Sequence, residues 1–407
     1  MDLDDTIDQL TDRISRHSPE RYPVQHATAH FHLGQALLQA GRTDDAATAL
    51  RTSMRWFPEG LVVERAKALN LLGAALRTKG DLDAAAEAFA GAGAVFARRK
   101  MTAEHGAALF NLGLVHSDLG NAHAAAESFA QAQERFADGS LGPQAAAAVH
   151  LGKALLEAGD VDAATTTLQR AVELCERVGD REGLGAAANA LGLAHLAARR
   201  PADAVEVLGL AVAAHPRSLR PAEFAMAKAN LALAYEGSAQ PARARLAARQ
   251  ALAVSEPPAP VLAQAEAVLA RLGPPTGSDL LAVLDDDPKE LWANTVREEL
   301  VRWAAVSPSE RRAEAVAWIQ AQARRPEVAD ELIHAWLSAL LELPPADLDT
   351  VVLAVLEAGD DVDPEVAAGF RSRVARAMAW FPVPQLMRLR DRFHHLAAQL
   401  GHDPTWS

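Results

Sequence analysis

The sequence is poor in cysteine. Its 407 residues include only one, Cys175. A single cysteine excludes a disulfide within the chain and supplies no thiolate cluster for a structural zinc ion. We therefore expect Cys175 to be a small buried apolar residue with no chemical role.

Positive charge and long apolar runs are also scarce. Lys and Arg total 40 against 53 Asp and Glu, which gives a net charge of −13. Such a surface repels polyanions, so we expect neither nucleic acid nor membrane as a partner. No apolar run approaches the roughly 20 residues that span a bilayer, and the acidic residues 2–5 are unlike a secretory signal. The sequence therefore predicts a soluble cytoplasmic protein.

Aromatic residues make up only 5% of the chain, and β-branched runs are few. Alanine and leucine are abundant instead, and both lose little conformational freedom on entering a helix. The composition therefore predicts an all-α fold with almost no sheet. The high alanine content is also typical of GC-rich bacterial genes.

A Leu-Gly pair recurs along the first 200 residues with a period of about 40 residues. The pairs end at Gly34, Gly73, Gly113, Gly152 and Gly192, and Leu231-Ala232 continues the series. The twelfth position after each of these residues is always alanine, and the sixteenth is usually large. The recurrent alanines are Ala46, Ala85, Ala125, Ala164, Ala204 and Ala244.

A turn divides each repeat into two helices. Gly41, Gly80, Gly120 and Gly159 mark it in the first four repeats, because a helix that ends in a left-handed residue favours glycine there. Arg199 and Ala239 occupy the same position in the fifth and sixth repeats. We expect the small residues to face one another where the helices cross, with large residues filling the gaps beside them. A single hairpin cannot bury its apolar stripe, so successive hairpins stack.

This pattern resembles the tetratricopeptide repeat, whose usual unit is about 34 residues. Units of about 40 residues, and residues 108–113 in particular, are similar to the long-helix variety found in kinesin light chains. The resemblance covers residues 27–254 and implies a right-handed α-α superhelix of six hairpins. It also implies a concave groove, lined by the first helix of each hairpin, that binds a protein or peptide partner.

Other segments flank these repeats. We predict a capping helix within residues 1–26, a closing helix and linker over 255–275, and a helical domain over 276–407. The C-terminal helices are either a bundle packed on the end of the repeats, which we favour, or a divergent continuation of the repeats. Five tryptophans fall in 276–403, against one inside the repeats. Ser307 and Asp363, each followed by proline, are expected to cap helices there. These C-terminal helices would add a second contact surface or form a homodimer.

Candidate chemical groups are few. His26 and His30, four residues apart on a helix, are weak candidates for metal ligands, but no glutamate completes the site. Acidic runs at residues 285–287 and 360–363 precede prolines, so we expect them to cap helices. No phosphate-binding loop and no nucleophile motif occurs. We therefore expect no catalytic residue and no cofactor, and the lack of such motifs favours a protein that is not an enzyme without deciding the question.

The resemblance places the partner-binding residues on the first helices. Positions three before, one after and four after each repeat glycine would line the groove, with further polar groups nearby. The residues that we expect to contact a partner are Gln35, Lys67, Asn70, Arg77, Phe110, Lys153 and Asn189.

Three functional hypotheses follow. The first is a non-catalytic interaction scaffold or adaptor that holds a partner segment in the groove. The second is a regulatory protein that changes shape on binding a peptide or small effector. The third is an enzyme or enzyme subunit with an enclosed pocket between the repeats and the C-terminal helices.

Overall fold

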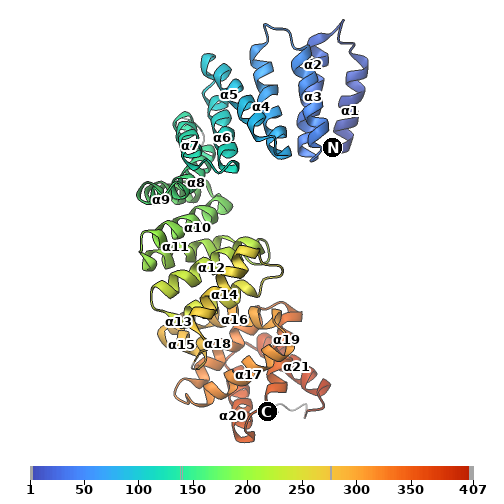
Figure 1. Cartoon of the computed structure of the whole chain (residues 1–407). Coiled ribbons are helices and arrows are strands. Elements are labelled where there is room, and N and C mark those ends of the chain that lie inside the picture. Colours follow the sequence, from blue (N-terminus) through green and yellow to red (C-terminus); the bar gives the residue numbers. More distant parts are fainter. Residues whose placement is uncertain (1–2, 138, 140, 276, 403–407) are drawn as a thin grey trace. The chain divides into compact units, whose positions relative to one another are not determined.

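The computed structural model describes residues 3–137, 139, 141–275 and 277–402. Within these residues the chain forms helices and no strand (Figure 1), which confirms the predicted all-α class. None of these helices is both long and apolar enough to cross a membrane. Contacts divide the chain into two compact units, residues 1–199 (unit 1) and residues 200–407 (unit 2).

Unit 1 begins with the predicted capping helix, α1 (Leu3–Arg16), whose Ile7 is buried against the first hairpin. Four helical hairpins and the first helix of a fifth follow. Their helices are α2 (Pro23–Gln39), α3 (Thr43–Trp56), α4 (Val62–Lys79), α5 (Leu82–Arg98), α6 (Thr102–Asp118), α7 (Ala122–Phe136), α8 (Leu141–Glu157), α9 (Val161–Val178) and α10 (Arg181–Ala197).

The repeat glycines lie where the two helices of a hairpin approach most closely. A Cβ atom at Gly152 would lie 2.4 Å from Cγ of Leu168, and one at Gly113 would lie 2.7 Å from the Phe129 ring. The glycine thus faces the large residue sixteen positions later, rather than chiefly the recurrent alanine that we expected. Those alanines are all fully buried beside this contact. Glycine is required because any side chain would occupy the space of the large residue.

The turns confirm the left-handed geometry predicted for them. Gly41, Gly80, Gly120 and Gly159 have φ values between 71° and 86°. Arg199 and Ala239, which replace glycine, adopt the same conformation at φ 58° and 56°. A residue with a Cβ atom is strained there by roughly 1–2 kcal/mol.

Cys175 is fully buried, as predicted. Burial raises the pKa of its thiol to about 11, and the negative charge of Asp180 contributes to the same shift.

Unit 2 joins the last repeat helices to the C-terminal helices. The repeat helices are α11 (Pro201–Ala214), α12 (Pro221–Gly237) and α13 (Pro241–Leu252), and the predicted closing helix is α14 (Ala259–Leu272). The C-terminal elements are α15 (Asp279–Asp286), η1 (Lys289–Leu291), α16 (Trp292–Ala305), α17 (Pro308–Ala323), α18 (Ala329–Glu342), α19 (Pro345–Ala358), α20 (Pro364–Met378) and α21 (Val383–Gln399).

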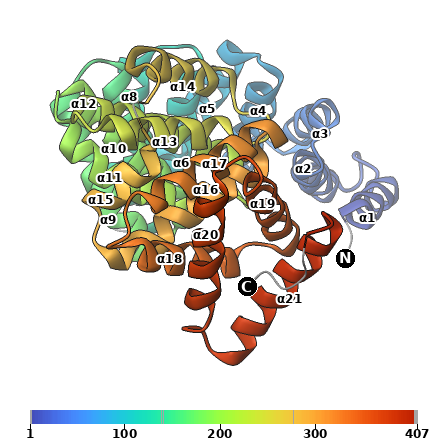
Figure 2. The ribbon, with the colours of Figure 1, turned by 90° about the horizontal axis from the view of Figure 1, so that it is seen from below.

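The C-terminal helices pack mainly against the helix two positions further along the chain. Trp303, Trp318 and Trp336 fill their core together with Phe370 and Phe393. As predicted, Ser307 and Asp363 cap helices by accepting backbone N–H groups of Glu310 and Glu365. Within unit 2, α12 and α14 lie in the upper part of the view in Figure 2, and α20 and α21 lie in its lower part. The boundaries predicted at residues 26, 254 and 275 stay predictions.

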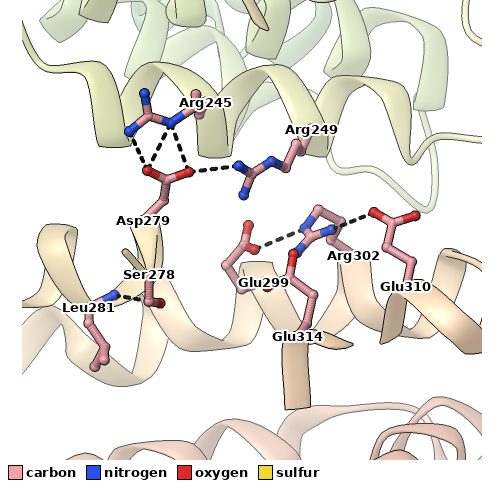
Figure 3. Close-up of polar contacts among 9 residues, drawn as sticks. All are labelled: Arg245, Arg249, Ser278, Asp279, Leu281, Glu299, Arg302, Glu310 and Glu314. Atoms are coloured by element: carbon pink, nitrogen blue, oxygen red, sulfur yellow. Dashed lines mark hydrogen bonds and ion pairs between the residues drawn. The ribbon is translucent and has the colours of Figure 1, made fainter. Parts of the chain in front are cut away.

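Buried ion pairs connect α13 to the C-terminal helices (Figure 3). Asp279 at the start of α15 accepts hydrogen bonds from Arg245 at 2.6 Å and from Arg249 at 2.7 Å, and its side chain is only 2% exposed. Gln250 of α13 donates to Glu299 of α16 at 2.6 Å, and Glu299 also pairs with Arg302. Burial raises the pKa of Glu299, which the nearby Arg302 opposes.

The close packing of the repeat glycines predicts that substitution by alanine lowers stability at a repeat glycine but not at an unpacked one. Gly152→Ala should lower the free energy of unfolding by about 1–3 kcal/mol, because the new methyl overlaps Leu168. Gly209→Ala in α11 is the matched control, because nothing lies within 4 Å of its Cβ position. It should stabilise by about 0.5–1 kcal/mol. Urea denaturation followed by far-UV circular dichroism measures both, and equal effects would contradict the packing argument.

The Asp279 contacts predict a large cost for removing one charge. Asp279→Asn leaves Arg245 and Arg249 partly buried without a carboxylate, which should cost about 3–5 kcal/mol of the free energy of unfolding. Asp285→Asn is the control, because its ion pair with Arg325 is exposed and should contribute less than about 1 kcal/mol. Tryptophan fluorescence during urea unfolding reports on unit 2. Similar losses in the two variants would contradict this ranking.

Candidate functional site

The first helices of the hairpins lie on the inner side of unit 1. Contacts between alternate helices join α2 to α4, α4 to α6, and α8 to α10, all of them first helices. Helices that approach one another in this way line the shorter arc of a stack of hairpins, because the second helices are spread apart. We call this surface the first-helix face.

The seven residues predicted to bind a partner are all on first helices. Gln35 is on α2, Lys67, Asn70 and Arg77 are on α4, Phe110 is on α6, Lys153 is on α8 and Asn189 is on α10. Gln35 and Lys67 are exposed, and the other five are partly buried. The structure brings Arg77, Phe110 and Lys153 together, whereas Gln35 and Asn189 lie on the helices at either end.

His150 is the residue around which these three gather. Its ring centroid lies 5.2 Å from that of Phe110 and 5.3 Å from that of Phe129. Lys153 follows it by three residues on the same face of α8, and the charges of Lys153 and Arg77 both act on it. We call Arg77, Phe110, His150 and Lys153 the His150 cluster. The sequence pattern did not single out His150, although its i, i+3 spacing from Lys153 places it on this face.

Lys153 is the unpaired charge of the cluster. Burial lowers its pKa, and the nearby Glu157 opposes that shift. No hydrogen bond or ion pair reaches its ammonium group from the residues that the structure describes. Arg77, in contrast, donates to Asp118 of α6 at 2.6 Å. A partly desolvated ammonium without a partner favours an anion beside it.

The histidine of the cluster is held neutral. Its pKa falls to about 4, mainly because of burial, with smaller contributions from the positive charges of Lys153 and Arg77. Near neutral pH the imidazole therefore adds an aromatic surface rather than a third charge. Asn70, two turns before Arg77 on α4, contributes a buried Oδ1 atom that accepts no hydrogen bond.

His26 and His30 contact each other rather than forming an open metal site. Their ring centroids are 4.6 Å apart, and His26 also packs against Trp56 and bonds the His17 carbonyl oxygen through Nδ1. Burial, with a smaller contribution from His26, lowers the pKa of His30 to about 4. Among the described residues, no group of three or more metal-ligating side chains occurs.

The acidic runs differ in part from their predicted capping role. Asp363 caps α20, but Asp287 pairs with Arg243 at 2.8 Å and accepts from Thr295. Asp361 pairs with Arg312. These carboxylates lie near arginines from other helices, which a sequence pattern cannot locate, so tertiary ion pairs replace the local caps.

Unit 2 contains a cavity of about 1060 Å³. It lies among the start of α12, the end of α13, α16 and the start of α19, and its lining is more apolar than polar. This is the region where the third functional hypothesis places a pocket. A smaller cavity of about 290 Å³ lies between α12, α13 and α16.

Repeated helical hairpins that cross at a glycine define a helical repeat protein. Sequence profiles of the tetratricopeptide repeat match residues 16–55, 106–138 and 143–217. The chain therefore contains tetratricopeptide repeats in these segments, as the sequence pattern predicted.

Several solved structures are similar to parts of the chain. BtubC from P. vanneervenii is 19% identical, with 53% of this chain and 91% of that one covered at a TM-score of 0.46. PilF from Pseudomonas aeruginosa is 16% identical, with 60% and 97% covered at 0.47. A putative kinesin light chain from Podosopora anserina is 21% identical, with 51% and 95% covered at 0.40. No curated protein sequence matches the chain.

The lowered pKa of His150 predicts a stability that falls in mild acid. In the unfolded chain the imidazole of His150 has its ordinary pKa of 6.5, whereas in the folded chain its pKa is about 4. Stability from this group is therefore present above pH 6.5 and lost as the pH falls towards 4, by at most about 1.4 kcal/mol per pH unit. His150→Phe keeps the aromatic contacts and should flatten this dependence.

Urea denaturation at a series of pH values measures the effect. His30 contributes in the same range, so the variant should retain part of the slope. At about pH 8 His150 is neutral in both the folded and the unfolded chain. The difference in stability between the wild type and His150→Phe at that pH therefore measures the change in packing alone. A slope unchanged by His150→Phe would show that this histidine is not held neutral.

Proposed function

We propose that the protein is a non-catalytic adaptor that binds an extended segment of a partner protein on the first-helix face of unit 1. The observation that carries the proposal is Lys153, a partly buried ammonium group without a partner beside aromatic rings. A stacked repeat can bury its own core without such a charge. The partly buried, unpaired ammonium group of Lys153 lowers the stability of the free chain, so a role in binding a partner best explains its presence.

The cluster supports a particular kind of segment. Lys153 would pair with an acidic side chain, and Arg77 can share its guanidinium between Asp118 and the partner. Phe110 and His150 would pack against an apolar residue of the segment. Both rings are partly exposed, and the His150 imidazole is uncharged near neutral pH. Asn70 on α4 would add a further polar contact, although its Oδ1 atom is buried in the free chain. Gln35, Lys67 and Asn189 would extend the contact along the face.

The C-terminal helices would supply a second contact or a homodimer. Trp380 and Val383 are 56% and 69% exposed, and Met387 follows Val383 by one helical turn. Their exposure supports this part of the proposal. The cavity of unit 2 lies where the third hypothesis, an enzyme or enzyme subunit, places a pocket, and it would also admit the small effector of the second hypothesis.

Loss of the Lys153 charge should weaken partner binding without unfolding the chain. Lys153→Met keeps the apolar stem and removes the desolvated ammonium, so the variant should be at least as stable and should bind the partner at least about ten-fold more weakly. The measurement is affinity capture from native cell extract, followed by titration of the captured protein. Binding by the wild type should also weaken as salt is raised.

Lys79→Met is the matched control. Lys79 lies on the same helix as Arg77, but its ammonium pairs with Asp44 of α3, away from the cluster. A partner retained by the wild type and by Lys79→Met, and lost by Lys153→Met, supports the proposal. A partner that all three capture equally, or the absence of any stoichiometric partner, contradicts it.

A further inference from the structure

The cavity of unit 2 has one wall from repeat helices and one from C-terminal helices. Arg217 and Phe224 come from the α11–α12 loop and from α12, Val301 and Val306 from α16 and its end, and Asp347 from α19. Its volume of about 1060 Å³ is at the upper end of small-molecule sites, and its lining is mainly apolar.

Most charged groups at the cavity already have partners. Glu298 accepts from Lys228 at 2.5 Å, and Arg297 donates to Glu342 at 2.5 Å. Arg217 differs, because its guanidinium donates to the carbonyl oxygen of Ala253 and has further N–H groups available. Burial lowers the pKa of Arg217, although Asp347 opposes that shift. The guanidinium stays charged at neutral pH in spite of this burial.

We propose that this cavity binds a small organic monoanion, a carboxylate with an apolar body, with the carboxylate at Arg217 and the apolar body against Phe224, Val301 and Val306. The remaining N–H groups of a guanidinium suit a carboxylate, whose two oxygens can accept them together. Asp347 and Glu298 also line the cavity, and their negative charges repel a phosphate dianion about twice as strongly as a carboxylate monoanion. This site is separate from the first-helix face and does not rest on the adaptor proposal.

A ligand in this cavity would also stabilise the present arrangement of the helices around it. The ligand would contact α12 and α13 on one side and α16 and α19 on the other, so it would bind best when these helices keep their present spacing. Binding would therefore strengthen the connection between the last repeat and the C-terminal helices.

Calorimetric titration of the full chain with decanoate tests the proposal. Decanol, which has the same apolar body without the charge, is the matched ligand. Decanoate should saturate one site below about 1 mM and bind at least about ten-fold more tightly than decanol. Arg217→Met should remove that preference. Arg390→Met is the control variant, because Arg390 is exposed on α21 and pairs with the adjacent Asp391.

Val301→Trp is a second variant that leaves Arg217 in place. The larger ring should fill part of the cavity and weaken decanoate by at least about ten-fold, and the thermal midpoint of the variant shows that it still folds. No saturable binding by decanoate overturns the proposal. Equal binding of decanol and decanoate, or decanoate binding that survives both Arg217→Met and Val301→Trp, also overturns it.

Discussion

Unit 1 depends on the contact between a glycine of each first helix and the large side chain of its second helix. Gly34, Gly73, Gly113 and Gly152 each lie where a Cβ atom would enter Leu50, Phe89, Phe129 or Leu168. The missing side chain lets the helix backbones approach, and the large residue fills the remaining space, so each hairpin has one packing solution. Because the same contact recurs about every 40 residues, successive hairpins stack in the same way.

This contact also determines which residues are available to a partner. The glycine side of each first helix is committed to its own hairpin, so the neighbouring side forms the inner face. Phe110 contacts Phe129 of its own hairpin and also His150 of the next first helix, where Lys153 lies three residues further along the chain. Stacking thus produces a desolvated charge beside two aromatic rings, a combination that no single hairpin contains.

The repeats and the capping helix α1 could be predicted from sequence because they depend on local spacing, and so could the left-handed turns at Gly41 and Gly80. Arg77, Phe110 and Lys153 could be placed on one face for the same reason. The aromatic contact of Phe110 with His150, and the pairing of Arg77 with Asp118, join residues about 40 positions apart. Their formation depends on the distance between hairpins, which no local pattern encodes. Asp287 was assigned to a cap for that reason.

The end of the repeat array shows a different physical rule. In α13 the exposed side is not left for another hairpin, because Arg243, Arg245 and Arg249 reach carboxylates that belong to the C-terminal helices. Paired charges of this kind add little net stability over apolar packing, but a wrong neighbour would leave them buried and unpaired. A seventh hairpin, with the usual alanines on its surface, would leave the three arginines of α13 buried and unpaired. Charge on α13 therefore specifies which helices follow the array, whereas glycine and alanine specify the array itself.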